Sequence, residues 1–71
     1  MADTIAVRFG KRLRVLRQRR GWTQLQLGEK LGLDRGYISD IENGKRNISL
    51  EVLEIIATGF EMSVSGLLSG V

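Results

Sequence analysis

The charged side chains of this sequence are unevenly distributed, and their positions indicate a chemistry of anion binding. Residues 1–20 hold seven basic groups and a single acid, whereas residues 21–71 hold four basic groups and seven acids. The first segment therefore carries a net charge of +6 and the remainder a net charge of −3. Such asymmetry suggests that one face contacts a polyanion, but a solvated basic helix face explains these charges equally well.

The composition offers little for catalysis or metal binding. The sequence has no His and no Cys, so the usual general base near neutral pH, the strongest nucleophile and the commonest transition-metal ligands are missing. Its 71 residues allow one small domain, residues 1–71, with little room for a water-excluding pocket. We therefore expect no enzyme activity, no cofactor, no metal and no small-molecule ligand.

The sequence contains no apolar stretch of membrane-spanning length and no signal-peptide run at its N-terminus. Because cysteine is absent, nothing indicates export. We expect a cytoplasmic protein without a membrane partner.

The elements that position the charged groups are predicted to be helices. A helix is expected over residues 4–19, ended by Gly21, because apolar residues recur there at i, i+4, i+8 and i+11. This stripe consists of Ile5, Phe9, Leu13 and Leu16. No segment alternates with a period of two over a useful length, so no sheet is expected.

Four more helices are predicted from capping signals. Residue types that cap helix N-termini stand at Thr23, Asp34, Ser49 and Ser63. Gly32 ends the second helix, and Asn43 with Gly44 ends the third. The fourth helix is expected to face the core with Leu50, Leu53, Ile56, Ala57 and Phe60. The sequence thus predicts an all-α fold, a compact bundle of five short helices.

Residues 24–43 have the spacing of a helix-turn-helix. Gly32 allows the positive φ of a tight turn, and Gly28 allows the two helices to cross closely. The apolar positions bury the inner side of both helices and leave the outer side of the second helix free. These positions are Leu27, Leu31, Leu33, Ile38 and Ile41.

From about Phe9 to Leu68, the chain resembles the phage-repressor-like (Xre/Cro-type) helix-turn-helix family. The similar stretches are LRVLRQRRGWTQ, QLGEKLGLDRGYISDIENGKRNIS and LEVLEIIATGFEMSVSGLL. Within the family, DRGYISDIENGKRNISL most resembles the controller proteins of restriction–modification systems. The resemblance implies a lambda-repressor-like DNA-binding domain. It also implies a dimeric, autoregulatory controller of a restriction–modification operon, which binds a pseudo-palindromic operator in double-stranded DNA.

The helix that follows Asp34 is then expected to lie in the major groove with its first residues at the base edges. Arg35 is placed to pair with a guanine, unless it is only a solvated helix residue. Tyr37 either packs on the sugar–phosphate backbone or covers the edge of the core. The full set of expected DNA contacts is Gln24, Arg35, Gly36, Tyr37, Ser39, Asp40, Asn43, Lys45, Arg46 and Asn47.

Several of these contacts have alternative roles. Asp40 accepts from a cytosine amino group, orients Arg35 or faces solvent. Gln24, Lys45 and Arg46 are expected at phosphates, since phosphate contacts outnumber base contacts. At Gly36, where relatives tend to carry a side chain, either a base contact is lost or the backbone comes closer to DNA.

The resemblance also implies a structural ion pair. The family pattern pairs a glutamate at the end of the recognition helix with an arginine of the first helix. In this sequence the two residues are Glu42 and Arg17, and we expect the pair to be partly buried.

Residues 49–69 are expected to complete the core and to form the interface of a homodimer. The candidate interface residues are Val52, Ile55, Val64, Leu67 and Leu68; alternatively, the last helix covers this stripe within one chain. Glu51 and Glu54 are candidate contacts for RNA polymerase, or simply part of a solvated helix face. A second function from another class is a protein-interaction module, such as an antitoxin-type regulator, that acts through this C-terminal apolar surface.

Overall fold

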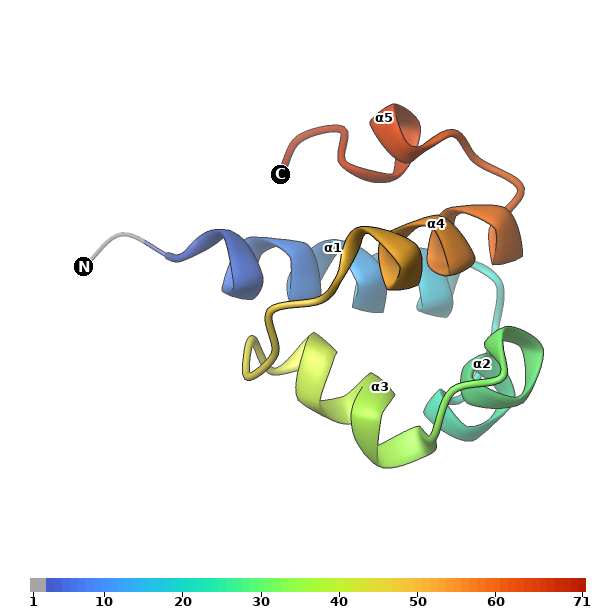
Figure 1. Ribbon diagram of the computed structural model, residues 1–71. Helices are drawn as coiled ribbons and strands as arrows, with labels where there is room; N and C mark the ends of the chain where they lie inside the picture. Colours follow the sequence, from blue (N-terminus) through green and yellow to red (C-terminus); the bar gives the residue numbers. More distant parts are fainter. Residues whose placement is uncertain (1–2) are drawn as a thin grey trace.

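The computed structural model describes residues 3–71, which form five helices joined by short loops (Figure 1). The helices are α1 (Ile5–Arg19), α2 (Gln24–Leu31), α3 (Arg35–Glu42), α4 (Leu50–Gly59) and α5 (Val64–Leu67). No strand occurs within residues 3–71, and the all-α prediction is confirmed. Over the same residues, none of the helices combines the length and the hydropathy needed to cross a bilayer.

The helices begin where the capping signals predicted. Thr23 and Gln26 form a capping box, in which Thr23 Oγ1 accepts from the Gln26 amide at 3.1 Å and Gln26 Oε1 accepts from the Thr23 amide at 2.8 Å. The side chains of Asp34, Ser49 and Ser63 cap α3, α4 and α5, each accepting from one backbone amide of the first turn. Each cap satisfies a backbone donor that the first turn of a helix leaves free.

The helices pack around a single apolar core. α1 runs across the molecule, with α2 and α3 on one side of it and α5 on the other (Figure 1). α3 packs against both α1 and α2, while α4 packs against α2 and α5. The core residues are Phe9, Leu13, Leu16, Leu27, Leu31, Ile38, Ile41, Ile56, Ala57, Phe60 and Leu67.

Gly10 allows the close crossing of α1 and α3. A Cβ atom at this position would collide with the carbonyl oxygen of Ile41 and would lie 2.7 Å from that of Glu42. Both neighbours are backbone atoms, which cannot move aside as a side chain can. The C-terminal end of α3 is therefore fixed directly against the backbone of α1.

Three residues lie elsewhere than the sequence predicted. Ile5 and Leu50, expected in the core, are 63% and 83% exposed. Each is the first residue of its helix, and at that end of the helix the core does not cover the side chain. Leu67, expected at a dimer interface, is instead fully buried, because the turn of α5 faces inward. Of the other expected interface residues, Val52 and Leu68 are half-buried against the core, and Ile55 and Val64 are exposed.

Trp22 covers the core near the ends of α1 and α4. Its ring centroid lies 5.5 Å from that of Phe60. The guanidinium carbon of Arg20 lies 5.3 Å from the Trp22 centroid, and the Lys30 ammonium lies 4.7 Å from it. Cations at such distances are attracted to the electron-rich face of an indole. Trp22 thus joins the loop after α1 to α2 and to the end of α4.

Candidate nucleic-acid interface

The turn between α2 and α3 presents α3 on the outside of the molecule. Gly32 has φ +69°, in the left-handed region that glycine adopts without strain. A Cβ at Gly28 would lie 2.5 Å from the carbonyl oxygen of Leu33, so the crossing of α2 with the turn requires a residue without a side chain. Ile38 and Ile41 turn the inner face of α3 into the core and leave its outer face free.

The predicted contact residues of α3 share this outer face. Arg35 and Gly36 in the first turn are exposed, Ser39 and Asp40 are half-exposed one turn later, and Asn43 is exposed at the end of the helix. Within residues 3–71, the Arg35 side chain has no hydrogen-bond or ion-pair partner. The structure therefore brings these five residues together on one surface, with the guanidinium of Arg35 free for a ligand.

Glu42 lies at the centre of a polar network beneath this surface. Its side chain is fully buried, and Arg17 contacts both carboxylate oxygens, from Nε to Oε2 at 2.6 Å and from Nη2 to Oε1 at 3.0 Å. Gln24 Nε2 donates to Oε1 at 3.1 Å, and Arg14 Nε donates to the same atom at 3.3 Å. Arg17 also donates from Nη1 to the Trp22 carbonyl at 2.8 Å. The network connects α1, α2 and α3 through one carboxylate.

The network changes the ionisation of both members of the central pair. Burial alone would raise the pKa of Glu42, but hydrogen bonds from Arg17, Gln24 and Arg14 outweigh it and hold the pKa below its usual range. The hydrogen bond to Glu42 raises the pKa of Arg17. Both groups are therefore charged at neutral pH, and the carboxylate is stabilised in its ionised form.

Acid is expected to weaken the fold through Glu42. A carboxyl group with a lowered folded-state pKa stabilises the fold above its unfolded pKa of about 4.3, and this contribution is lost as the pH falls through the folded value. The free energy of unfolding should therefore rise with pH across this acid range. Urea unfolding followed by circular dichroism between pH 3 and pH 7 measures this slope. In Glu42→Gln, which cannot titrate, the slope should be smaller; an unchanged slope would assign the acid sensitivity to other carboxyl groups.

Two predicted contacts are engaged within the chain. Gln24, expected at a phosphate, is half-buried and donates to Glu42 as described above. Asn43 Oδ1 accepts from Arg14 Nη2 at 3.3 Å. These contacts hold the side chains of Gln24 and Asn43 against α3 and α1, respectively.

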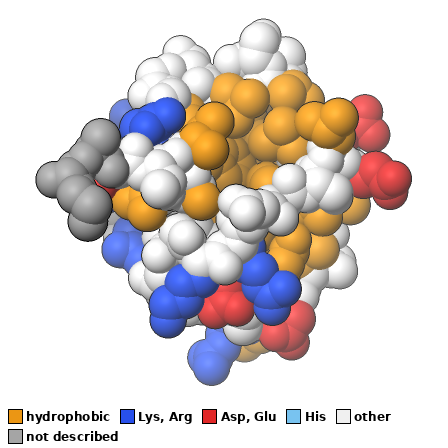
Figure 2. Space-filling model, turned by 60° about the vertical axis from the view of Figure 1, so that its left-hand side comes forward, with side chains coloured by type: hydrophobic (Ala, Val, Ile, Leu, Met, Phe, Trp, Pro, Cys, Tyr) orange, Lys and Arg blue, Asp and Glu red, His pale blue; other side chains and the backbone are white. Residues whose placement is uncertain are grey.

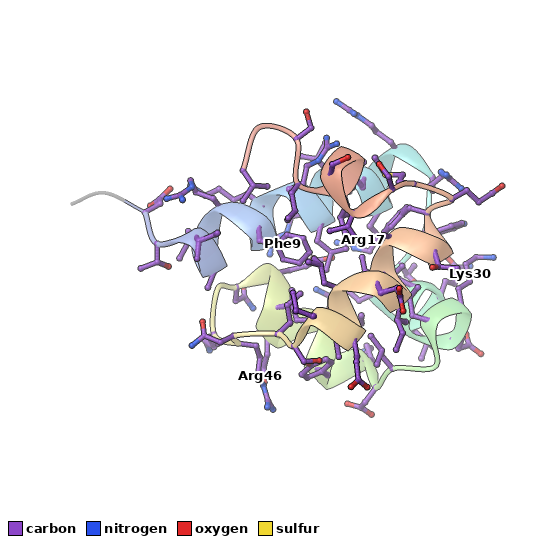
Figure 3. All side chains as sticks on the ribbon, turned by 45° about the horizontal axis from the view of Figure 1, so that its top comes forward. Phe9, Arg17, Lys30 and Arg46 are labelled. Atoms are coloured by element: carbon purple, nitrogen blue, oxygen red, sulfur yellow. The ribbon has the colours of Figure 1, made fainter. Side chains whose placement is uncertain are left out.

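The loop after α3 carries the remaining candidates. Lys45, Arg46 and Asn47 are exposed, and Figure 3 shows Arg46 on the loop between α3 and α4. The Arg46 guanidinium lies over the ring of Tyr37, 5.1 Å from its centroid, and its Nε is 3.3 Å from Asp40 Oδ2. Tyr37 also packs against the core. This ion pair was not predicted from the sequence, because its partners are six positions apart across a turn.

A model of the helix-turn-helix family matches residues 13–67. That range contains α2, the turn at Gly32 and α3, together with residues 13–19 of α1 and all of α4 and α5. The chain belongs to the helix-turn-helix family.

Relatives of this helix-turn-helix chain include restriction–modification controllers. Control protein C.MunI from a Mycoplasma species is 43% identical over 70 residues, which cover 97% of this chain and 95% of that protein. The crystal structure of the controller protein C.AhdI from Aeromonas hydrophila has a TM-score of 0.83 at 40% identity, covering 87% of this chain and 94% of that one. The structure of the C.Esp1396I tetramer in complex with its natural 35 base-pair operator has a TM-score of 0.84 at 32% identity. The match covers 96% of this chain and 90% of that one.

In this helix-turn-helix protein, Arg12 of α1 and Arg20, which follows α1, make contacts that were not predicted from the sequence. Arg12 donates to the carbonyls of Leu67 and Gly66 at 3.1 and 3.0 Å, and Arg20 donates to the carbonyl of Phe60 at 2.9 Å. Neither α4 nor α5 has a basic residue in its last turn, so their C-terminal carbonyls need donors from elsewhere. The absence of basic residues from both last turns is the signal in the sequence that could have pointed to these donors. Arg12 and Arg20 supply such donors, so both guanidinium groups are engaged within the chain.

Proposed function

We propose that this protein is a homodimeric, sequence-specific DNA-binding regulator of transcription that controls a restriction–modification operon. The observation that carries the proposal is the free guanidinium of Arg35 in the first exposed turn of α3, on a helix whose inner face is buried in the core. The structure of C.Esp1396I with its operator supports the same use of the fold. A regulator of such an operon would act in the cytoplasm, and we propose that location for this protein.

In the proposed complex, α3 lies in the major groove. Arg35 reads a guanine with two parallel hydrogen bonds, and Ser39 and Asn43 lie near neighbouring bases. Lys45 and Asn47, both exposed on the following loop, contact the phosphates that flank the groove. The N-terminus of α2 offers backbone amides to a phosphate, because a helix start attracts anions.

The proposed dimer forms through exposed apolar side chains. Ile55 and Val64 are 41% and 39% exposed, and Leu50 is almost fully so. Figure 2 shows hydrophobic side chains gathered on one part of the molecular surface. A groove of about 200 Å³ lies between the start of α1, Ile48 and Leu68. A two-fold dimer would present two α3 helices about one turn of DNA apart, ~34 Å, and would require a pseudo-palindromic operator.

Replacing Arg35 with alanine tests the proposal. A duplex carrying the DNA upstream of the protein's own gene is titrated with wild type and Arg35→Ala by fluorescence anisotropy, beside a scrambled duplex. Loss of a bidentate base contact should weaken binding to the native duplex about ten- to hundredfold. Binding of wild type to both duplexes should fall as salt rises, because phosphate contacts release counterions.

Arg19→Ala is the matched control, because Arg19 is an exposed arginine of α1 and its loss changes the net charge equally. If both variants weaken binding to the same degree, Arg35 acts only through its charge. If wild type binds the two duplexes equally and weakly, specific DNA recognition fails. A protein-interaction module that uses the apolar surface is then the better account.

A further inference from the structure

Asp40 and Arg46 form an ion pair on the surface proposed for DNA. Arg46 Nε lies 3.3 Å from Asp40 Oδ2, and the guanidinium covers the Tyr37 ring. The backbone helps to place the pair, because the Lys45 amide donates to the Asp40 carbonyl at 2.9 Å and turns the loop back over the end of α3. The two side chains are 40% and 52% exposed, so water and a ligand both reach them.

The pair matters because its partners respond to DNA in opposite ways. A phosphate would attract Arg46 and repel Asp40. While the two are paired, their charges cancel at the centre of the contact surface. A phosphate that captures Arg46 therefore leaves the carboxylate of Asp40 without its cation, close to a polyanion.

Resting on the proposed function, we propose that Asp40 determines specificity by holding Arg46 away from non-cognate DNA. A non-cognate duplex obtains the Arg46 contact only by breaking the ion pair and leaving Asp40 uncompensated. A cognate site that places a cytosine amino group near Asp40 supplies the missing donor. Asp40 thus lowers affinity for the wrong sequence more than for the right one, which is how a repulsive element produces discrimination.

Asp40→Asn tests the inference, because asparagine keeps the size of the side chain and removes its charge. Exposed ion pairs contribute little, so binding to the scrambled duplex should tighten by about two- to fivefold. The freed Arg46 should add one phosphate contact, so the slope of log affinity against log salt should steepen by about 0.9. Affinity for the native duplex should rise less, and the ratio of the two affinities should fall. Glu54→Gln, which removes an exposed charge from α4, is the matched control and should leave the ratio unchanged.

The role of Arg46 is isolated by repeating Asp40→Asn in an Arg46→Ala background. The steeper slope should disappear there, because no guanidinium remains to be freed. A slope change of the same size in both backgrounds, or none in either, would overturn the inference. NMR of the DNA-free protein gives an independent measurement: the Arg46 Nε–H resonance should shift in Asp40→Asn, and an unshifted resonance would also count against the pair. Loss of native-over-scrambled preference in wild type would instead contradict the proposed function, since the NMR and slope measurements need no operator.

Discussion

Replacing Glu42 with alanine is expected to destabilise the fold by about 3–5 kcal/mol, the range for removing one partner of a buried ion pair. The loss is large because Arg17 and Gln24 would keep their polar groups inside the protein without the acceptor they share. A chain of this size has a total stability of about 4–10 kcal/mol. Urea unfolding followed by circular dichroism should show a much lower unfolding midpoint, and a variant that is mostly unfolded without urea if the wild-type stability is near the lower end of that range.

Glu54→Ala is the control for this experiment, because Glu54 is an exposed acid on α4. It should shift the unfolding midpoint little. Arg14→Ala gives an intermediate case: Arg14 contacts the same carboxylate, but its side chain is 44% exposed, so its removal should cost below about 1 kcal/mol. If Glu42→Ala unfolds at the same urea concentration as Glu54→Ala, the network does not hold α3 in place.

Leu67→Ala should destabilise the protein by about 2–5 kcal/mol, although α5 is only four residues long. Leu67 is fully buried, and its removal leaves a cavity between α5 and the rest of the core. A single turn cannot persist in water without such packing. The effect therefore combines a cavity with the release of α5.

The comparison variant is Leu50→Ala, which makes the same chemical change at a position that is 83% exposed. Its stability should stay within about 0.5 kcal/mol of wild type at a concentration where the protein is monomeric. Thermal unfolding of the two variants at matched low concentration measures the difference. If Leu67→Ala proves no more damaging than Leu50→Ala, the packing of Leu67 does not hold α5 against the core.

The helices of this protein could be predicted from sequence because their boundaries are local. Thr23 meets Gln26 within one turn, and Asp34 reaches the amide of Gly36 two residues on. Gly32 needs only its own backbone freedom to end α2. Such signals act over a few residues, and the chain carries them at every helix start that the sequence predicted.

The errors and omissions concern contacts between distant segments. A periodic stripe assigns Leu50 and Leu67 to a face of their helices, but it does not say which neighbour covers that face. The donors for the carbonyls of α5 come from Arg12, 54 and 55 positions away. For the candidate site, the position of α3 followed from the sequence, whereas the pairing of Asp40 with Arg46 depends on the path of a loop.

The position of Trp22 makes it an optical reporter of this fold. It is the only tryptophan in the chain, so intrinsic fluorescence excited at the red edge comes from one place. Its indole lies close to the cations of Arg20 and Lys30 and to the ring of Phe60, and its carbonyl accepts from Arg17. Its emission therefore reports both on the packing of α4 and on the Arg17–Glu42 network. A shift of the emission maximum without loss of helicity would show that the bundle loosens before it unfolds.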